Sequence, residues 1–257
     1  MDKSAGTTTG ELLTRYRNRL VTEETSRGRR RPGTVNRYLT SLSHAFTVAV
    51  KTLEWIDRNP VRNVERLEEP EGRTRFLTPE EIVELLRCCK ESPCAALYPI
   101  VILALSTGMR RGEILNLRWS DVDFERRQIV LPKEKTKTRQ RRVIPLVGHA
   151  LETLVEWSKE RSNDSDLVFP GRMKGKPMTI REPWEKALRA AGIEDYRFHD
   201  NRHSAASYLL MTGATDMEVA GILGHLTLAM VKRYAHMSDQ HRRRVLERMN
   251  REVFSTG

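Results

Sequence analysis

Cysteine is scarce in this chain of 257 residues, which contains three: Cys88, Cys89 and Cys94. Two of them are adjacent and none forms a Cys-x-x-Cys pair, so the sequence indicates neither a disulfide framework nor a zinc site. Long apolar runs are also missing, and none approaches the length of a bilayer span. The polar N-terminus shows no signal peptide, so we expect reduced thiols and a cytoplasmic protein without membrane association.

Acidic residues are in deficit. The chain has 45 Lys and Arg against 34 Asp and Glu, a formal net charge of +11, and its isoelectric point is about 9.9. A surplus this large favours a polyanionic partner, and nucleic acid fits better than a membrane surface. No DxD or His/Cys cluster suggests a metal site, and no glycine-rich loop suggests a nucleotide site, so we expect neither a metal ion nor a nucleotide cofactor.

The pattern in residues 1–66 is helical. In TVNRYLTSLSHAFTVAVKTLEWI, apolar residues recur at helical spacing, and Thr34 behind Pro32-Gly33 is the predicted N-cap. An earlier helix is predicted from Leu12 to Val21. A basic loop, SRGRRRPG, separates the two helices and is either a solvated loop or a phosphate contact.

A charged segment, Leu67 to Phe76, contains a proline and a glycine and predicts a linker. Capping boxes that begin at Thr78 and Thr215 predict two helix starts. The strings DVDF, QIVLP and RRVIPL predict three short strands around turns. Together these patterns predict an α+β fold that is mainly helical, with a small antiparallel sheet.

Three strings carry the chemistry: TGMRRGE from Thr107, HDNRHS from His199 and LGHLTLAMVKRYAH from Leu223. Cleaving a phosphodiester without a metal requires fixed cations that neutralise the non-bridging oxygens, and planar guanidinium groups suit this task. Arg110 and Arg202 are the predicted pair. From about residue 10 to residue 240, the chain resembles the tyrosine recombinase (phage integrase) family.

The resemblance implies DNA strand cleavage through a covalent 3′-phosphotyrosine. It assigns Tyr234 as the nucleophile and Glu113 as the acid that orients the active-site cations. It implies proton transfer at His199 and a hydrogen bond from His225 to the scissile phosphate. The family's hairpin lysine, which protonates the leaving 5′-oxygen, corresponds to Lys137, eight residues before Pro145. The alternatives for this lysine are Lys135 and Lys133.

The resemblance also implies double-stranded DNA recombination sites as partners and self-association into a tetramer on DNA. The apolar stripe of the predicted final helix within residues 239–257 docks either into a neighbouring subunit or onto its own domain. The residues expected to contact the DNA backbone are Arg27, Arg29, Arg30, Arg31, Arg37, Lys133, Lys135 and Arg139.

The expected domains are a helical core-binding domain at 1–66 that lacks its first helix, a linker at 67–76, and a catalytic domain at 77–257 with a C-terminal helix. Two alternatives to a recombinase are a type IB topoisomerase and a DNA-binding protein that performs no strand exchange. The sequence departs from the family at Asn201, where an apolar residue is usual. A buried asparagine must find hydrogen-bond partners or reduce stability.

Overall fold

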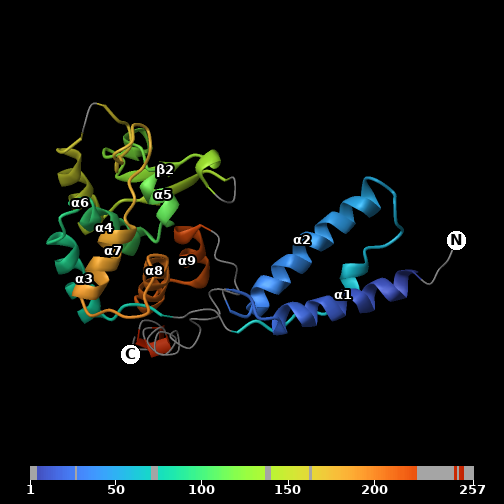
Figure 1. Ribbon diagram of the computed structural model, residues 1–257. Helices are drawn as coiled ribbons and strands as arrows, with labels where there is room; N and C mark the ends of the chain where they lie inside the picture. The colour runs from blue at the N-terminus through green and yellow to red at the C-terminus, as the bar shows by residue number, and fades with distance from the viewer. Residues whose placement is uncertain are drawn as a thin grey trace. The chain divides into compact units, whose positions relative to one another are not determined.

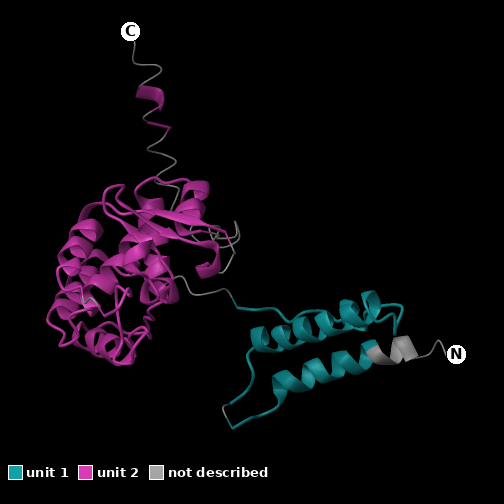
Figure 2. Cartoon of the chain, turned by 90° about the horizontal axis from the view of Figure 1, so that it is seen from above, with its two compact units in different colours: residues 1–73 teal, residues 74–257 magenta. Residues whose placement is uncertain are grey.

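A computed structural model describes residues 5–26, 28–70, 75–136, 140–161, 164–224, 246–247 and 249–251 (Figure 1). The chain divides into two compact units, residues 1–73 and residues 74–257, which Figure 2 shows in different colours. Unit 1 contains helices α1 (Ala5–Thr22) and α2 (Pro32–Lys51) and the 3₁₀ turn η1 (Pro60–Asn63). Unit 2 contains α3 (Pro79–Lys90), α4 (Leu97–Thr107), α5 (Arg111–Leu115), η2 (Trp119–Asp121), β1 (Val122–Asp123), β2 (Gln128–Leu131), η3 (Lys133–Lys135), β3 (Arg142–Pro145), α6 (Gly148–Ser158), α7 (Arg181–Ala190), α8 (Asp200–Met211) and α9 (Asp216–Leu223).

The two long helices of unit 1 are those predicted from the apolar spacing, although their ends differ. Helix α2 begins at Pro32, with Arg31 in the cap position at φ −70° and ψ 148° and no side-chain cap bond. The prediction that Thr34 caps this helix was therefore wrong. Proline suits the first helical position because its φ is already fixed near the helical value and its missing N–H needs no partner there.

Segment 65–69 follows η1 and is hydrogen-bonded to both helices of unit 1. The Asn36 side chain of α2 donates to the Leu67 carbonyl at 2.8 Å and accepts from the Leu67 amide at 3.0 Å. Its amide also donates to Glu69 at 2.8 Å, and Arg17 of α1 donates to the Glu65 carbonyl at 2.5 Å. The first residues of the predicted linker, 67–76, are thus attached to unit 1.

Helix α4 is the centre of unit 2. Its sequence, LYPIVILALST, contains no charged residue, and most of its side chains are buried. Helices α3, α6 and α8 pack against it (Figure 1). A helix that is apolar on all sides needs such enclosure. Across the described ranges, no helix has both the length and the apolar character needed to cross a membrane.

The three predicted strands form one antiparallel sheet in the order β1-β2-β3. Val130 of β2 lies opposite Val143 of β3, and Ile129 lies opposite Ile144. Burial alternates along β3: Arg142 and Ile144 are buried, while Val143 and Pro145 are exposed. Because strand side chains alternate between faces, Arg142 shares the inner face of the sheet with Ile144.

Both predicted capping boxes are present. Thr78 caps α3 with Glu81 at the third helical position, and Thr215 caps α9 with Glu218 in the same role. The start of α3 is also fixed by α8. The Leu77 amide donates to Ser204 at 3.1 Å, and the Tyr208 hydroxyl donates to the Leu77 carbonyl at 3.0 Å.

The Asn36 contacts give a testable prediction for unit 1. We expect Asn36→Ala to speed amide hydrogen exchange at Leu67 by about tenfold or more, because the amide loses its acceptor and the carbonyl loses its donor. Hydrogen-exchange mass spectrometry measures this rate, and the exposed Asn63→Ala is the matched control. Equal exchange in the two variants would mean that Asn36 does not hold this segment.

Candidate active site

The first element of the site is the turn at Gly108, which ends α4. Gly108 has φ 59°, a left-handed conformation that favours glycine. A Cβ at this position would lie 2.0 Å from Cδ2 of Leu223, the last residue of α9. Only a residue without a side chain therefore allows α9 to pack this closely against the end of α4.

Arg110 and Glu113 flank the first turn of α5. The backbone amide of Arg110 donates to Glu113 Oε2 at 2.9 Å, and its Nη1 donates to Glu113 Oε1 at 2.6 Å. The Arg110 side chain is 25% exposed, whereas that of Glu113 is 4% exposed. The buried Glu113 carboxylate thus fixes Arg110 and leaves part of its guanidinium exposed to solvent.

Arg202, in the first turn of α8, is 6% exposed. Its Nη1 donates to the Gly108 carbonyl at 2.6 Å, and its Nη2 donates to the Gly224 carbonyl at 3.3 Å. Arg110 Nη2 donates to the same Gly224 carbonyl at 3.2 Å, so both predicted arginines converge on one oxygen. Burial, and then the charges of Arg110 and Arg142, lower the pKa of Arg202 to about 10, which leaves it protonated at neutral pH.

A third arginine, Arg142 of β3, joins this pair, and the sequence reasoning missed it. Its Nη1 donates to Glu113 Oε2 at 3.2 Å, and its Nη2 donates to the Ile222 carbonyl at 2.7 Å. The available signal was the strand alternation, which places Arg142 on the same face as Ile144. We call Arg110, Arg142, Arg202 and Glu113 the arginine cluster.

His199 occupies the cap position of α8, one turn before Arg202. Partial burial lowers the pKa of its imidazole, and the charges of Arg202 and Arg110 lower it further, while Asp200 opposes them. The neutral imidazole is therefore favoured at neutral pH, and it can accept a proton. Its ring lies edge-on to that of His203, with centroids 5.7 Å apart.

Asn201, the departure from the family pattern, has partners. Its side chain is 1% exposed, accepts a hydrogen bond from the Tyr196 hydroxyl at 3.0 Å, and donates to the Phe198 carbonyl at 3.0 Å. The Tyr196 hydroxyl also bonds Ser204 at 2.8 Å. The buried Asn201 side chain thus has the hydrogen-bond partners that we expected it to require, and one of them is Tyr196.

Lys135, one alternative to Lys137, is engaged elsewhere. Its ammonium pairs with the carboxylate of Asp121 in η2. Thr136, which follows, accepts from the Gln140 amide at 3.1 Å and donates to the Gln140 carbonyl at 2.7 Å, so its side chain joins the two ends of the hairpin loop. Lys133, the other alternative, is exposed.

Several predicted residues lie outside the described residues. These are Lys137, His225 and Tyr234 among the catalytic candidates, and Arg27 and Arg139 among the expected DNA contacts. Most of the predicted final helix at 239–257 lies there as well. The structure therefore places Arg110, Glu113, His199 and Arg202 and leaves the nucleophile and the hairpin lysine as sequence predictions.

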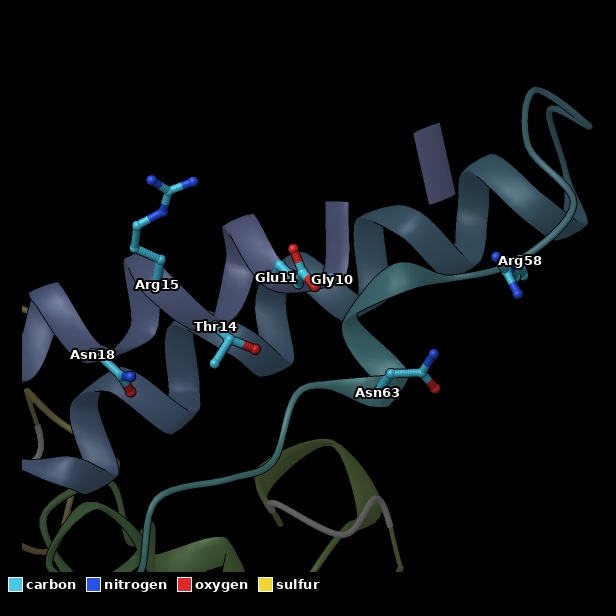
Figure 3. A pocket seen from close by; sticks show the side chains of 7 residues that line it. All are labelled: Gly10, Glu11, Thr14, Arg15, Asn18, Arg58 and Asn63. Carbon is cyan, nitrogen blue, oxygen red and sulfur yellow. The ribbon is translucent and has the colours of Figure 1, made fainter. Parts of the chain in front are cut away.

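The other expected DNA contacts are mostly at the surface. Arg31 and Arg37 are exposed, Arg29 pairs with Glu24 at 3.5 Å, and Arg30 pairs with Glu23 at 2.8 Å. A groove in unit 1 also contains basic residues; its lining consists of Gly10, Glu11, Thr14, Arg15, Asn18, Arg58 and Asn63. Arg15 points away from the other labelled side chains of this groove (Figure 3), so they do not converge on one ligand.

Within the described ranges, no group of three or more His, Cys, Asp or Glu residues could hold a metal ion. A second cavity, in unit 2, is lined mainly by apolar and aromatic side chains, among them Trp119, Trp157 and Phe169. It shares no residue with the arginine cluster. The cluster is thus the feature of the described chain that is suited to phosphate chemistry.

A mainly helical unit with a three-stranded antiparallel sheet and converging arginines has the architecture expected of a tyrosine recombinase catalytic unit, and the predicted fold class is confirmed. Residues 75–241 match the phage integrase family, and the chain belongs to that family.

Three known proteins illustrate the likeness. The Shufflon-specific DNA recombinase of Escherichia coli is 37% identical over 207 residues, which are 79% of this chain and 51% of that protein. The integrase of Salmonella phage P22 is 30% identical over 217 residues, which are 79% of this chain and 54% of that protein. The catalytic domain of bacteriophage HP1 integrase matches with a TM-score of 0.52 at 27% identity, covering 69% of this chain and 96% of that domain. The chain spans about half the length of the two curated relatives.

The Asn201–Tyr196 contact can be tested by a double-mutant cycle. We expect Asn201→Leu and Tyr196→Phe each to lower the free energy of unfolding by about 1–3 kcal/mol, because each removes one hydrogen-bond partner from a buried polar group. The double variant should lose less than the sum of the two, with a coupling of about 1 kcal/mol or more.

Urea unfolding measures these free energies. The exposed Asn116→Leu is the matched control, and we expect it to change stability by less than about 0.5 kcal/mol. Strictly additive losses in the cycle would show that Tyr196 does not hold Asn201.

Proposed function

We propose that this chain is a site-specific DNA recombinase of the integrase type, which cleaves and rejoins DNA strands through a covalent 3′-phosphotyrosine. The observation that carries the proposal is the convergence of Arg110 and Arg202 on one oxygen, the Gly224 carbonyl. The arginine cluster contains three guanidiniums and one carboxylate, which pairs with Arg110 and Arg142, so the cluster retains an excess of two positive charges for an anion. A phosphodiester in the transition state of cleavage is an anion of this kind.

Each step of the proposed reaction has a candidate group. The Tyr234 hydroxyl loses its proton to the neutral imidazole of His199 and attacks phosphorus. A bond forms between the tyrosine oxygen and phosphorus, and the bond to the 5′-oxygen breaks. Lys137 protonates that oxygen, while Arg110 and Arg202 neutralise the non-bridging oxygens. Attack of a 5′-hydroxyl on the phosphotyrosine reverses these steps and rejoins a strand, so no external energy source is required.

The proposal extends to partners and assembly. The net charge of +11 and the name of the 37%-identical relative support double-stranded DNA as the partner. Unit 1, with its exposed Arg29, Arg31 and Arg37, is the proposed core-binding unit, and unit 2 is the proposed catalytic unit. Exchange between two DNA sites requires four strand cleavages, so we propose a tetramer on DNA. Resealing of the same strand without exchange would instead indicate a type IB topoisomerase.

Loss of the nucleophile is the first test. A library of nicked duplexes of random sequence is incubated with the protein, and protein-linked DNA is recovered under denaturing conditions and sequenced. On a duplex selected in this way, we expect Tyr234→Phe to abolish the covalent adduct and to leave binding intact. Tyr16→Phe, which removes an exposed hydroxyl in unit 1, is the control. An SDS-resistant adduct with Tyr234→Phe would exclude Tyr234 as the nucleophile.

The hairpin lysine is tested with a 5′-bridging phosphorothiolate, in which the leaving group is a thiolate that needs no proton. We expect this substrate to restore cleavage by Lys137→Ala. It should not restore cleavage by Lys135→Ala, because the ammonium of Lys135 already pairs with Asp121. Cleavage rates on the selected duplex with and without the sulfur give the comparison, and rescue of Lys135→Ala alone would reassign the acid to Lys135.

A further inference from the structure

Arg142 has no role in the reaction described so far, although it lies inside the arginine cluster. Its side chain is 9% exposed, compared with 25% for Arg110. Its Nη1 and Nη2 are both hydrogen-bonded within the protein, to Glu113 and to the Ile222 carbonyl. A guanidinium so enclosed does not present its donors to a phosphate at the surface. Any effect of Arg142 on the reaction must therefore pass through the groups it contacts.

The first of these groups is Glu113. Its Oε1 pairs with Arg110 at 2.6 Å, while its Oε2 also accepts from Arg142 at 3.2 Å. Without Arg142, both carboxylate oxygens could turn to Arg110 and form a bidentate pair, the strong arrangement for these two groups. An arginine held in that way offers less charge and fewer donors to phosphate. Because Arg142 shares the Glu113 carboxylate, donors of the Arg110 guanidinium stay available to a phosphate.

The second group is the backbone that leads into His225. Arg142 donates to the Ile222 carbonyl at 2.7 Å, and Gly224 lies against its guanidinium. A Cβ at Gly224 would lie 2.8 Å from Arg142 Cδ and 3.0 Å from its Nε. Arg142 therefore holds residues 222–224 in place by this hydrogen bond and contact. The carbonyl of Gly224, in turn, accepts hydrogen bonds from Arg110 and Arg202.

Stability alone does not account for this arrangement. Arg142 Nε is buried and has no hydrogen-bond partner among the described residues. Burial lowers the pKa of this guanidinium, and the nearby charge of Glu113 opposes that effect. A buried cation with an unpaired donor reduces stability, whereas an apolar residue on the inner face of a strand would not. A functional demand on this position explains why the cost is tolerated.

We propose that Arg142 is a positioning residue for strand cleavage: it shares Glu113 with Arg110 and supports the backbone that leads into His225. Because β3 also closes the hairpin that carries Lys137, Arg142 links three chain segments that each supply a candidate catalytic group. This inference rests on the proposed recombinase function.

The test compares Arg142→Met with wild type on the DNA selected for adduct formation. We expect the single-turnover cleavage rate at saturating DNA to fall by about 10²-fold, while the dissociation constant changes by no more than about threefold. Arg141→Met is the matched control, because Arg141 is the exposed neighbour of Arg142 and has the same charge. We expect it to retain the wild-type rate at saturating DNA.

A second substrate separates positioning from general loss of structure. In a methylphosphonate, a methyl group replaces one non-bridging oxygen, so an arginine that neutralises that oxygen matters less. If Arg142 acts through Arg110, then Arg142→Met and Arg110→Ala should both reduce the rate ratio of phosphate to methylphosphonate of one stereoisomer by about tenfold or more. Because Arg142 also supports the backbone that leads into His225, adding Arg142→Met to Arg110→Ala should slow cleavage further, but by a smaller factor than Arg142→Met produces alone.

A merely structural role would lower both rates by the same factor, and an unchanged ratio in Arg142→Met would overturn the inference. If circular dichroism shows that Arg142→Met is unfolded, Arg142→Lys decides, since it keeps the charge but can reach one acceptor instead of two; a wild-type ratio in that variant would also overturn it. Absence of any wild-type adduct would refute the proposed function itself, which is distinct from failure of the Arg142 inference.

Discussion

The shared carboxylate of Glu113 is the interaction on which the site depends. It accepts hydrogen bonds from the Arg110 amide, the Arg110 side chain and Arg142. Enclosing several cations together is unfavourable unless acceptors offset their repulsion and lost hydration. The carbonyls of residues 108, 222 and 224 supply the remaining acceptors. The arginines are thus fixed by atoms whose positions the fold sets. In the proposed reaction, their donors would be in place before the phosphate binds, which is the condition for strong electrostatic stabilisation.

At the end of α4, the packing of apolar residues also determines where a charged side chain lies. Leu223 of α9 contacts Gly108 so closely that any side chain at Gly108 would collide with it. Arg202 bridges the same two segments with hydrogen bonds to the carbonyls of Gly108 and Gly224. The separation of these carbonyls, and hence the orientation of Arg202, is therefore set by how α9 packs on the end of α4. A substitution at Gly108 would disturb the packing and the guanidinium together.

Sequence patterns predicted the parts of this structure that depend on neighbouring residues. The capping boxes at Thr78 and Thr215 and the three strands follow from local preferences, and the family motif identified Arg110, Glu113 and Arg202. The role of Arg142 in the arginine cluster could not be predicted, because its partners lie 29 and 80 residues away in the chain. The partner of Asn201 also could not be predicted, although Tyr196 is near in sequence, because their contact depends on how the turn before α8 folds.

The Gly224 carbonyl explains how the arginines can be held in place and still be available. Its bonds to Arg110 and Arg202, at 3.2 and 3.3 Å, are long for hydrogen bonds from a guanidinium. A neutral carbonyl is also a weaker acceptor than a charged phosphate oxygen. In the proposed reaction, a scissile phosphate would compete well for these two donors. The stronger bonds from Arg202 to Gly108 and from Arg110 to Glu113, both 2.6 Å, would meanwhile keep the guanidiniums in position. The strong bonds therefore set the geometry, and the weak ones leave donors that an anion can take over.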